Sequence, residues 1–296
     1  MSLKILIIGG SSIIGSKMIN VCQQNNIEFA FTFYNHETSF HGGFCLDITN
    51  KEDTKQLISK INPDIVFLAS ALTDINICET NMNLANSINV IGVDNVISGC
   101  KETKSKLAYV STSFVFDGVQ NQYFEDEPVS PSTNYGKTKA KGEELIKKSG
   151  LDFLILRTDA LYCWIEKWQR VNSVLRVLDT LRNGKILNEV TDWYNTPTYV
   201  PDFVNATEKL FKMNETGIFH VVGSEFINRY NWSVKVAEIF GLDKNLIKPI
   251  HSSTFNFPAN RVNINLKNTK LITKTKINMK NIEEGTIEML KNSPYS

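Results

Sequence analysis

The stretch Lys4-Ile5-Leu6-Ile7-Ile8-Gly9-Gly10-Ser11-Ser12-Ile13-Ile14-Gly15 decides the fold of this chain. A short apolar run, typical of a buried strand, leads directly into a glycine-rich turn and then into a helical pattern. In such a turn Gly9 permits the tight bend, and Gly15 permits close packing of the helix on the strand. The free N–H groups at the start of the helix suit a phosphate group. The stretch therefore predicts a dinucleotide-binding turn.

Ser12 stands where the usual phosphate-binding pattern has its middle glycine. Its side chain is small enough for a close approach of the ligand, but the replacement weakens the match. An ordinary strand-to-helix turn is therefore the alternative interpretation. If the turn binds a dinucleotide, the contacting residues are Gly9, Ser11, Ser12, Ile13, Ile14 and Gly15.

Beyond this turn, apolar runs alternate with helical patterns through the first half of the chain. This alternation predicts an α/β fold, a Rossmann-type doubly wound parallel sheet with covering helices. Strands are expected at residues 4–8, 28–33, 64–69, 107–111 and 152–157. Helices are expected at residues 12–24, 51–61, 80–100 and 134–148.

The second half is less regular and predicts a smaller mixed α/β lobe that binds substrate. Its expected elements are helices at 168–182, 230–240 and 282–290, and a late strand of the main sheet at 217–222. The predicted NAD(P)-binding domain spans residues 1–160, with a return segment at about 196–224. The predicted substrate lobe comprises residues 161–195 and 225–296.

The composition favours an ordinary globular protein. Of 296 residues, 42% are apolar and 21% are charged, and the net charge of +1 gives no reason to expect nucleic acid or an anionic membrane as a partner. No apolar run approaches the roughly 20 residues of a membrane span. The five cysteines form no CxxC pair, so buried reduced thiols and a cytoplasmic location are expected. The four histidines show no metal-ligand spacing, and no metal is expected.

A second cluster suggests proton-transfer chemistry. Tyr135 and Lys139 are four residues apart on a predicted helix, so their side chains share one face. A nearby ammonium favours the phenolate and lowers the pKa of the phenol. Thr112, at the end of a predicted strand, could bind the same substrate oxygen. The alternative is a solvated helix face with an extended lysine, and a threonine that only caps a turn.

The end of the second predicted strand bears on the choice of cofactor. NAD-specific sites usually carry an acidic residue there for the ribose 2′-OH. Residues 31–36 contain no carboxylate, so NADPH is expected, with NADH as the alternative. Asp47, followed by Ile48, could contact the adenine edge; a solvated loop acid is the alternative.

The motifs then resemble those of a known family. Residues 111–118, Ser-Thr-Ser-Phe-Val-Phe-Asp-Gly, and residues 135–139, Tyr-Gly-Lys-Thr-Lys, are similar to the extended short-chain dehydrogenase/reductases. More narrowly they resemble the dTDP-4-dehydrorhamnose reductase family, whose patterns read STDYVFDG and YGKTK. The resemblance extends over nearly the whole chain.

This resemblance implies roles for individual residues. Tyr135 would give its proton to the C4 oxygen of a nucleotide-linked 4-keto-6-deoxysugar. Lys139 would lower the pKa of Tyr135 and hold the nicotinamide ribose, and Thr112 would orient the carbonyl. Ala69, Ser70 and Ala71 would line the cofactor, together with Tyr135 and Lys139. The implied substrate-binding residues are Asn89, Thr112, Ser113, Phe114, Trp193 and Arg261.

The chain departs from the family pattern near the substrate. Ser113 and Phe114 replace an acid and a tyrosine, Ala160 replaces the aromatic of the family's RTSWVY stretch, and Val262 follows Arg261 in place of proline. These departures leave the exact sugar and its nucleotide, dTDP or UDP, open. A monomer or homodimer is expected.

Two other functions compete with a reductase. One is a related nucleotide-sugar epimerase or dehydratase, although a dehydratase usually needs an acidic pair after its catalytic threonine. The other is a non-catalytic, NADP-binding regulatory subunit of the methionine adenosyltransferase beta type, which keeps the fold and the cofactor site. The shared register of Thr112, Tyr135 and Lys139 favours the reductase.

Overall fold

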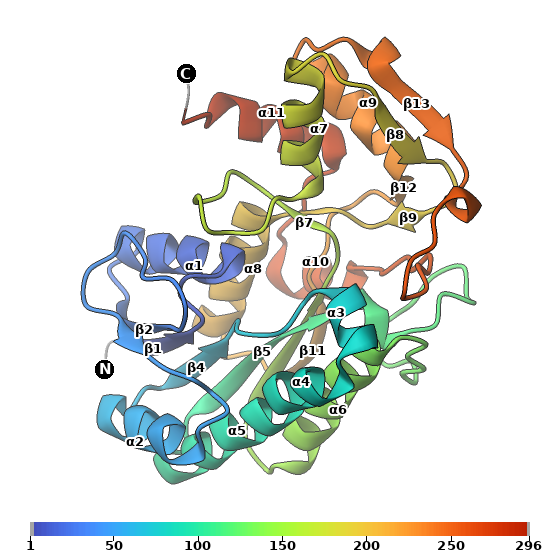
Figure 1. Cartoon of the computed structure of the whole chain (residues 1–296). Helices are drawn as coiled ribbons and strands as arrows, with labels where there is room; N and C mark the ends of the chain where they lie inside the picture. Colours follow the sequence, from blue (N-terminus) through green and yellow to red (C-terminus); the bar gives the residue numbers. More distant parts are fainter. Residues whose placement is uncertain (1–2, 295–296) are drawn as a thin grey trace.

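A computed structural model describes residues 3–294 of the chain and contains a seven-stranded parallel sheet (Figure 1). The strand order is β11-β6-β5-β4-β1-β2-β3, so the order reverses beside β1 and the sheet is doubly wound, as predicted. The strands are β1 (Lys4–Ile8), β2 (Glu28–Phe33), β3 (Phe44–Cys45), β4 (Ile65–Leu68), β5 (Lys106–Thr112), β6 (Phe153–Thr158) and β11 (Gly217–His220).

Alternating side chains of β1 enter two different cores, because successive residues of a strand point to opposite faces. Ile5 and Ile7 pack with residues of α1 (Ile13–Gln24) and α8 (Val200–Lys212). Leu6 and Ile8 pack on the other face with residues of α2 (Lys51–Ile61), α5 (Gly92–Thr103) and α6 (Asn134–Lys148). Helices therefore cover both faces of the sheet.

The helix predicted at residues 80–100 is wrong in its bounds. The structure has α3 (Ile75–Thr80), α4 (Met82–Asn86), a π-helical turn at Ser87–Ile91, and then α5, which continues to Thr103. Asn81 follows the last residue of α3 and is the N-cap of α4. Its side chain accepts a hydrogen bond from the backbone N–H of Leu84, in the first turn of α4. A polar cap thus interrupts a pattern that looks continuous in the sequence.

Outside the main sheet, residues 3–294 form three two-stranded sheets, two of them parallel and one antiparallel. Their strands are β7 (Leu161–Tyr162) with β10 (Thr198–Tyr199), β8 (Leu187–Val190) with β13 (Ile247–Ile250), and β9 (Tyr194–Asn195) with β12 (Ile227–Asn228). The remaining helices are α7 (Ser173–Arg182), α9 (Arg229–Ile239), α10 (Thr269–Thr275) and α11 (Ile282–Lys291). In Figure 1, α7, α9 and α11 lie above the sheet, whereas α8 lies beside α1.

The helix predicted at 168–182 begins later than expected. Asn172 is the N-cap of α7, and its side chain accepts a hydrogen bond from the N–H of Leu175. Residues 168–172 instead form a loop that contacts the main domain. The late strand predicted at 217–222 is confirmed as β11, which pairs with β6 at the edge of the main sheet.

The helices and the cysteines bear on the expectations drawn from the composition. Within residues 3–294, every helix is too short or too polar to cross a bilayer. Four cysteines are buried, but Cys45 is exposed, because β3 is a two-residue strand at the edge of the sheet.

Candidate active site

A cavity of about 640 Å³ lies at the carboxyl ends of the parallel strands. The β1–α1 turn and the ends of β2, β4, β5 and β6 form its floor, and loops of the smaller lobe form the opposite wall. This is the place where open α/β sheets bind their ligands. The volume lies within the usual range for ligand pockets.

The glycine-rich turn at one end of the cavity needs its glycines. Gly9 has a φ of +93°, and a Cβ there would lie 2.8 Å from the backbone nitrogen of Ser70. A Cβ on Gly15 would lie 2.1 Å from the carbonyl oxygen of Gly9. The first glycine therefore allows the bend and a close approach to the next strand, and the last allows the helix to pack on the turn.

The start of α1 offers donors for an anionic ligand. Ser12 is the N-cap, and its hydroxyl accepts a hydrogen bond of 3.0 Å from the N–H of Gly15. The N–H groups of Ile13 and Ile14, in the first turn, have no intrahelical acceptor, and both residues line the cavity. Donors at the positive end of a helix fit the pyrophosphate of a dinucleotide.

The end of β2 contributes the wall beside this turn. Residues 32–36 line the cavity and include neither acidic residues nor lysine or arginine. The hydroxyl of Thr32 accepts a hydrogen bond of 3.1 Å from the N–H of Gly9, which fixes the turn against β2.

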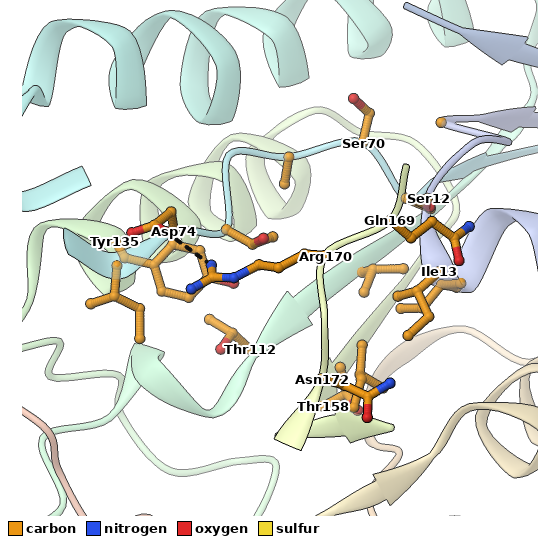
Figure 2. A pocket seen from close by; sticks show the side chains of 18 of the residues that line it. Ser12, Ile13, Ser70, Asp74, Thr112, Tyr135, Thr158, Gln169, Arg170 and Asn172 are labelled. Carbon is orange, nitrogen blue, oxygen red and sulfur yellow. Dashed lines mark ion pairs between the residues drawn. The ribbon is translucent and has the colours of Figure 1, made fainter. Parts of the chain in front are cut away.

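Thr112, Tyr135 and Lys139 meet at the other end of the same cavity. Thr112 ends β5, and the other two lie one turn apart on α6. Burial raises the pKa of Tyr135 to about 12, and a hydrogen bond with Thr112 opposes that shift. Figure 2 shows both side chains among those that line the pocket. The phenol therefore carries its proton throughout the physiological pH range.

Lys139 is almost completely buried. Its Nζ donates a hydrogen bond of 2.8 Å to the carbonyl of Val110 and lies 3.9 Å from the centre of the Tyr109 ring. Burial lowers the pKa of Lys139 to about 7, and the charge of Glu143 opposes that shift. The predicted lowering of the Tyr135 pKa by Lys139 is not seen in this structure, because desolvation prevails and raises the pKa of Tyr135.

A buried ion pair supports these groups from behind. Arg157 on β6 makes two hydrogen bonds to the carboxylate of Glu143, which lies one helical turn after Lys139. The same carboxylate accepts a hydrogen bond of 2.6 Å from Ser111, the neighbour of Thr112. The pair thus links α6, β5 and β6 next to Thr112 and Lys139.

At the wall of the cavity near Trp193, two guanidinium groups lie close to the indole ring. The Cζ of Arg229 lies 4.5 Å from the centre of the indole, and that of Arg261 lies 5.5 Å from it. All three residues line the cavity, as does Phe114. Guanidinium groups match the geometry of phosphate oxygens, so this wall offers donors for a second phosphate or diphosphate group.

Most of the predicted site residues line this one cavity. They are Gly9, Ser11, Ser12, Ile13, Ile14, Ile48, Ala69, Ser70, Ala71, Thr112, Phe114, Tyr135, Lys139, Trp193 and Arg261. Four others, Gly15, Asp47, Asn89 and Ser113, are not among the residues that line it. Gly15 acts through packing, and the carboxylate of Asp47 accepts hydrogen bonds from Thr49 in its own loop.

Asn89 lies behind the cavity wall. Its side-chain amide accepts from the N–H of Leu72, donates to the carbonyl of Leu72, and also donates to Thr138 on α6. It therefore holds the segment after β4 against α6. Asn89 does not line the cavity and its amide is occupied by these hydrogen bonds, so substrate binding by Asn89 stays a prediction.

Asp159, which was not predicted from the sequence, lines the cavity just after β6. Its carboxylate accepts hydrogen bonds from Ser113, from the side chain of Asn195 and from the N–H of Thr196. Ser113 therefore turns toward this acid and not toward the cavity. A polar residue at the carboxyl end of a strand was the available signal. Arg229 and the loop at 168–172 were also missed.

Comparisons with known proteins agree with this geometry. A family described as the RmlD substrate binding domain matches residues 3–294. The spore coat polysaccharide biosynthesis protein SpsK of Bacillus subtilis is 32% identical over 199 residues, covering 67% of this chain and 69% of SpsK. Methionine adenosyltransferase 2 subunit beta of Rattus norvegicus is 26% identical over 259 residues, covering 85% of this chain and 76% of that protein.

The fold also matches a solved structure along its length. The dTDP-4-dehydrorhamnose reductase of Bacillus anthracis, solved in complex with NADP, superposes with a TM-score of 0.89 at 24% identity. That match covers 99% of this chain and 100% of the other. The family match over nearly all residues, with the glycine-rich turn and the Thr, Tyr and Lys side chains in one cavity, shows that this chain belongs to the dTDP-4-dehydrorhamnose reductase family of extended short-chain dehydrogenase/reductases, which are NAD(P)-dependent oxidoreductases.

Proposed function

We propose that this protein reduces the C4 keto group of a nucleotide-linked 4-keto-6-deoxysugar with NADPH, acting as a monomer or homodimer. The observation that carries the proposal is that one cavity joins the phosphate-binding turn to Thr112, Tyr135 and Lys139. A dinucleotide whose pyrophosphate lies at Ile13 would extend along the sheet edge toward Tyr135. The bound cofactor would supply a hydride to the carbonyl carbon.

Proton transfer would fall to Tyr135. As hydride reaches the carbon, negative charge develops on the carbonyl oxygen, and a donor there stabilises it. Tyr135 keeps its proton in the free protein because burial raises its pKa to about 12. Thr112, hydrogen-bonded to Tyr135, would orient the same oxygen. Once the proton has left, the ammonium of Lys139 would stabilise the phenolate.

Lys139 must be charged to do this, and its surroundings only partly favour the charge. The carbonyl of Val110 and the face of Tyr109 each attract the ammonium. Burial opposes them and lowers the pKa to about 7. Lys139 would also donate to the nicotinamide ribose, and that contact would add a further partner for the ammonium.

The sugar nucleotide would lie between the catalytic end and the smaller lobe. Arg229 and Arg261, both near the indole of Trp193, would hold its diphosphate, and Phe114 would pack beside the sugar. The cofactor choice follows from the end of β2, where no carboxylate repels a 2′-phosphate. The Bacillus anthracis reductase, which has the same fold, was solved with NADP.

The second candidate is a regulatory subunit that binds NADP without turning over a sugar. Its support is the likeness to methionine adenosyltransferase 2 subunit beta over 85% of this chain. The family's catalytic positions are nevertheless intact here at Thr112, Tyr135 and Lys139, which favours the reductase.

A turnover assay separates the two candidates. Purified protein would be mixed with NADPH or NADH and a panel of dTDP- and UDP-linked 4-keto-6-deoxysugars, and oxidation of the cofactor and the product would be measured. Tyr135→Phe is the control for background oxidation. Turnover that depends on Tyr135 supports the reductase. Tight NADPH binding by calorimetry without oxidation across the panel would favour the regulatory subunit.

A further inference from the structure

The loop that joins β7 to α7, here called the clamp loop (residues 164–172), crosses from the smaller lobe to the phosphate-binding turn. The indole N–H of Trp168 donates a hydrogen bond of 3.2 Å to the carbonyl of Ser11. The side-chain amide of Gln169 donates to the same carbonyl at 3.0 Å and to the hydroxyl of Ser16 at 3.1 Å. Two adjacent side chains of the smaller lobe thus meet the turn that would hold the cofactor.

The other side of the clamp loop is tied to the opposite wall. Arg170 forms an ion pair of 3.1 Å with Asp74, in the segment that follows β4. Figure 2 shows the loop running through the pocket, with Gln169 beside Ser12 and Ile13 and with Arg170 directed toward Asp74. The loop therefore spans the cavity between the pyrophosphate end and the catalytic end.

The base of the clamp loop is also fixed. The side chain of Asn172 donates a hydrogen bond of 2.7 Å to the carbonyl of Cys163, so the two ends of the loop are held together. A loop whose ends are held close together forms a compact surface unit. The contacts at its tip then decide whether the loop stays over the cavity.

We infer that the clamp loop is part of the cofactor site: Trp168 and Gln169 position the phosphate-binding turn, and the loop holds the bound dinucleotide in the cavity. This inference rests on the proposed function. The two donors fix the carbonyl of Ser11, and with it the peptide that leads into the N-cap of α1. Residues 168–173 and the turn line the same cavity, so a dinucleotide bound against the turn would also lie next to the clamp loop.

The ion pair of Arg170 and the hydrogen bonds of Trp168 and Gln169 differ in strength. Arg170 is 69% exposed, and an exposed ion pair holds weakly. The three hydrogen bonds of Trp168 and Gln169 are partly buried and hold more firmly. Release of the cofactor therefore requires the clamp loop to leave Ser11, and the rate of release reports on those bonds.

The test measures the dissociation rate of NADPH by stopped-flow fluorescence. Gln169→Leu keeps the size of the side chain and removes two hydrogen bonds, so the dissociation rate should rise about tenfold. Trp168→Phe removes one bond and keeps an aromatic ring, so a smaller rise is expected. Gln56→Leu, at an exposed position of α2, is the matched control and should behave as the wild type.

A split between kinetic constants separates positioning from a general loss of structure. In Gln169→Leu the KM for NADPH should rise about tenfold, while the KM for the sugar nucleotide and the thermal midpoint stay near wild type. If NADPH binds the wild type and both variants release it at the wild-type rate, the inference about the clamp loop is refuted, while the proposed reductase function is not affected. If NADPH does not bind the wild type, the proposed function itself fails.

Discussion

Replacing Arg157 by methionine tests whether the buried ion pair behind the site behaves as its geometry implies. Arg157 and Glu143 are 1% and 0% exposed, and their hydrogen bonds measure 2.9 Å from Nε to Oε1 and 2.8 Å from Nη2 to Oε2. Methionine preserves part of the stem and removes the guanidinium. The carboxylate of Glu143 is then buried without its counter-charge, which costs about 3–5 kcal/mol of stability.

Thermal unfolding measures this cost. At about 2–3 °C for each kcal/mol in a chain of this size, the midpoint should fall by roughly 6–15 °C. Lys148→Met is the control, because it breaks the ion pair with Glu144 on the exposed face of the same helix. Such surface pairs contribute little, so the control should unfold near the wild-type temperature.

A double variant identifies the cause of the loss. Arg157→Met with Glu143→Leu removes both charges and leaves apolar groups of similar size, which should recover most of the lost stability. Ser111 loses its acceptor in this variant, so recovery is incomplete. A midpoint for Arg157→Met within about 2 °C of wild type, or a double variant less stable than the single one, would show that the ion pair does not stabilise the fold in this way.

Three further results follow from the site. Tyr135→Phe removes the proton donor and keeps the ring, so kcat should fall by a factor of about 10²–10⁴ while the Kd for NADPH, measured by calorimetry, barely changes. Asn35→Asp places a carboxylate at the end of β2 without a change of size, and the ratio of kcat/KM for NADPH to that for NADH should drop about tenfold; an unchanged ratio would mean that the 2′-phosphate lies elsewhere. In the proposed mechanism the ammonium of Lys139 is the active form, and its pKa is lowered to about 7, so kcat/KM should fall as the pH rises through about 7. Lys139→Arg, whose charge persists, should lose that alkaline limb at whatever activity remains.

The first half of the fold could be predicted because its signals are local. The helices at 51–61 and 134–148 were predicted with the bounds that the structure has. Each follows a capping residue, Asn50 and Thr133, whose side chain accepts hydrogen bonds from the first turn. In both helices the helical periodicity and the capping residue indicate the same bounds, so the sequence pattern was sufficient to predict them.

The clamp loop could not be predicted in the same way. Residues 168–182 show an amphipathic pattern, but the first five of them leave the helix because Trp168 and Gln169 bind Ser11, more than 150 residues earlier in the chain. Those bonds are visible only once the two lobes are placed together. Periodicity contains no information about such contacts.

The site shows the same division between local and distant information. The turn, Thr112, Tyr135 and Lys139 were found from spacing, because each spacing reflects one strand or one helix. Whether Asn89 and Ser113 face the cavity depends on contacts with other elements, and both lie behind its wall. The raised pKa of Tyr135 likewise depends on burial, which the spacing of Tyr135 and Lys139 does not report.

The register of the sheet explains the departure from the family pattern at Ser113. In the family pattern an acid follows the catalytic threonine and a serine follows the threonine of the next strand; in this chain Ser113 follows Thr112, and Asp159 follows Thr158. Thr112 and Thr158 are direct neighbours in the pairing of β5 with β6. Ser113 and Asp159 are therefore adjacent, and the hydroxyl lies 3.1 Å from the carboxylate. Relative to the family pattern, the serine follows β5 and the acid follows β6, so a carboxylate still lies in the wall beside Thr112. That carboxylate now also holds Asn195 and Thr196 of the smaller lobe, which joins the catalytic strand to the loop that carries Trp193.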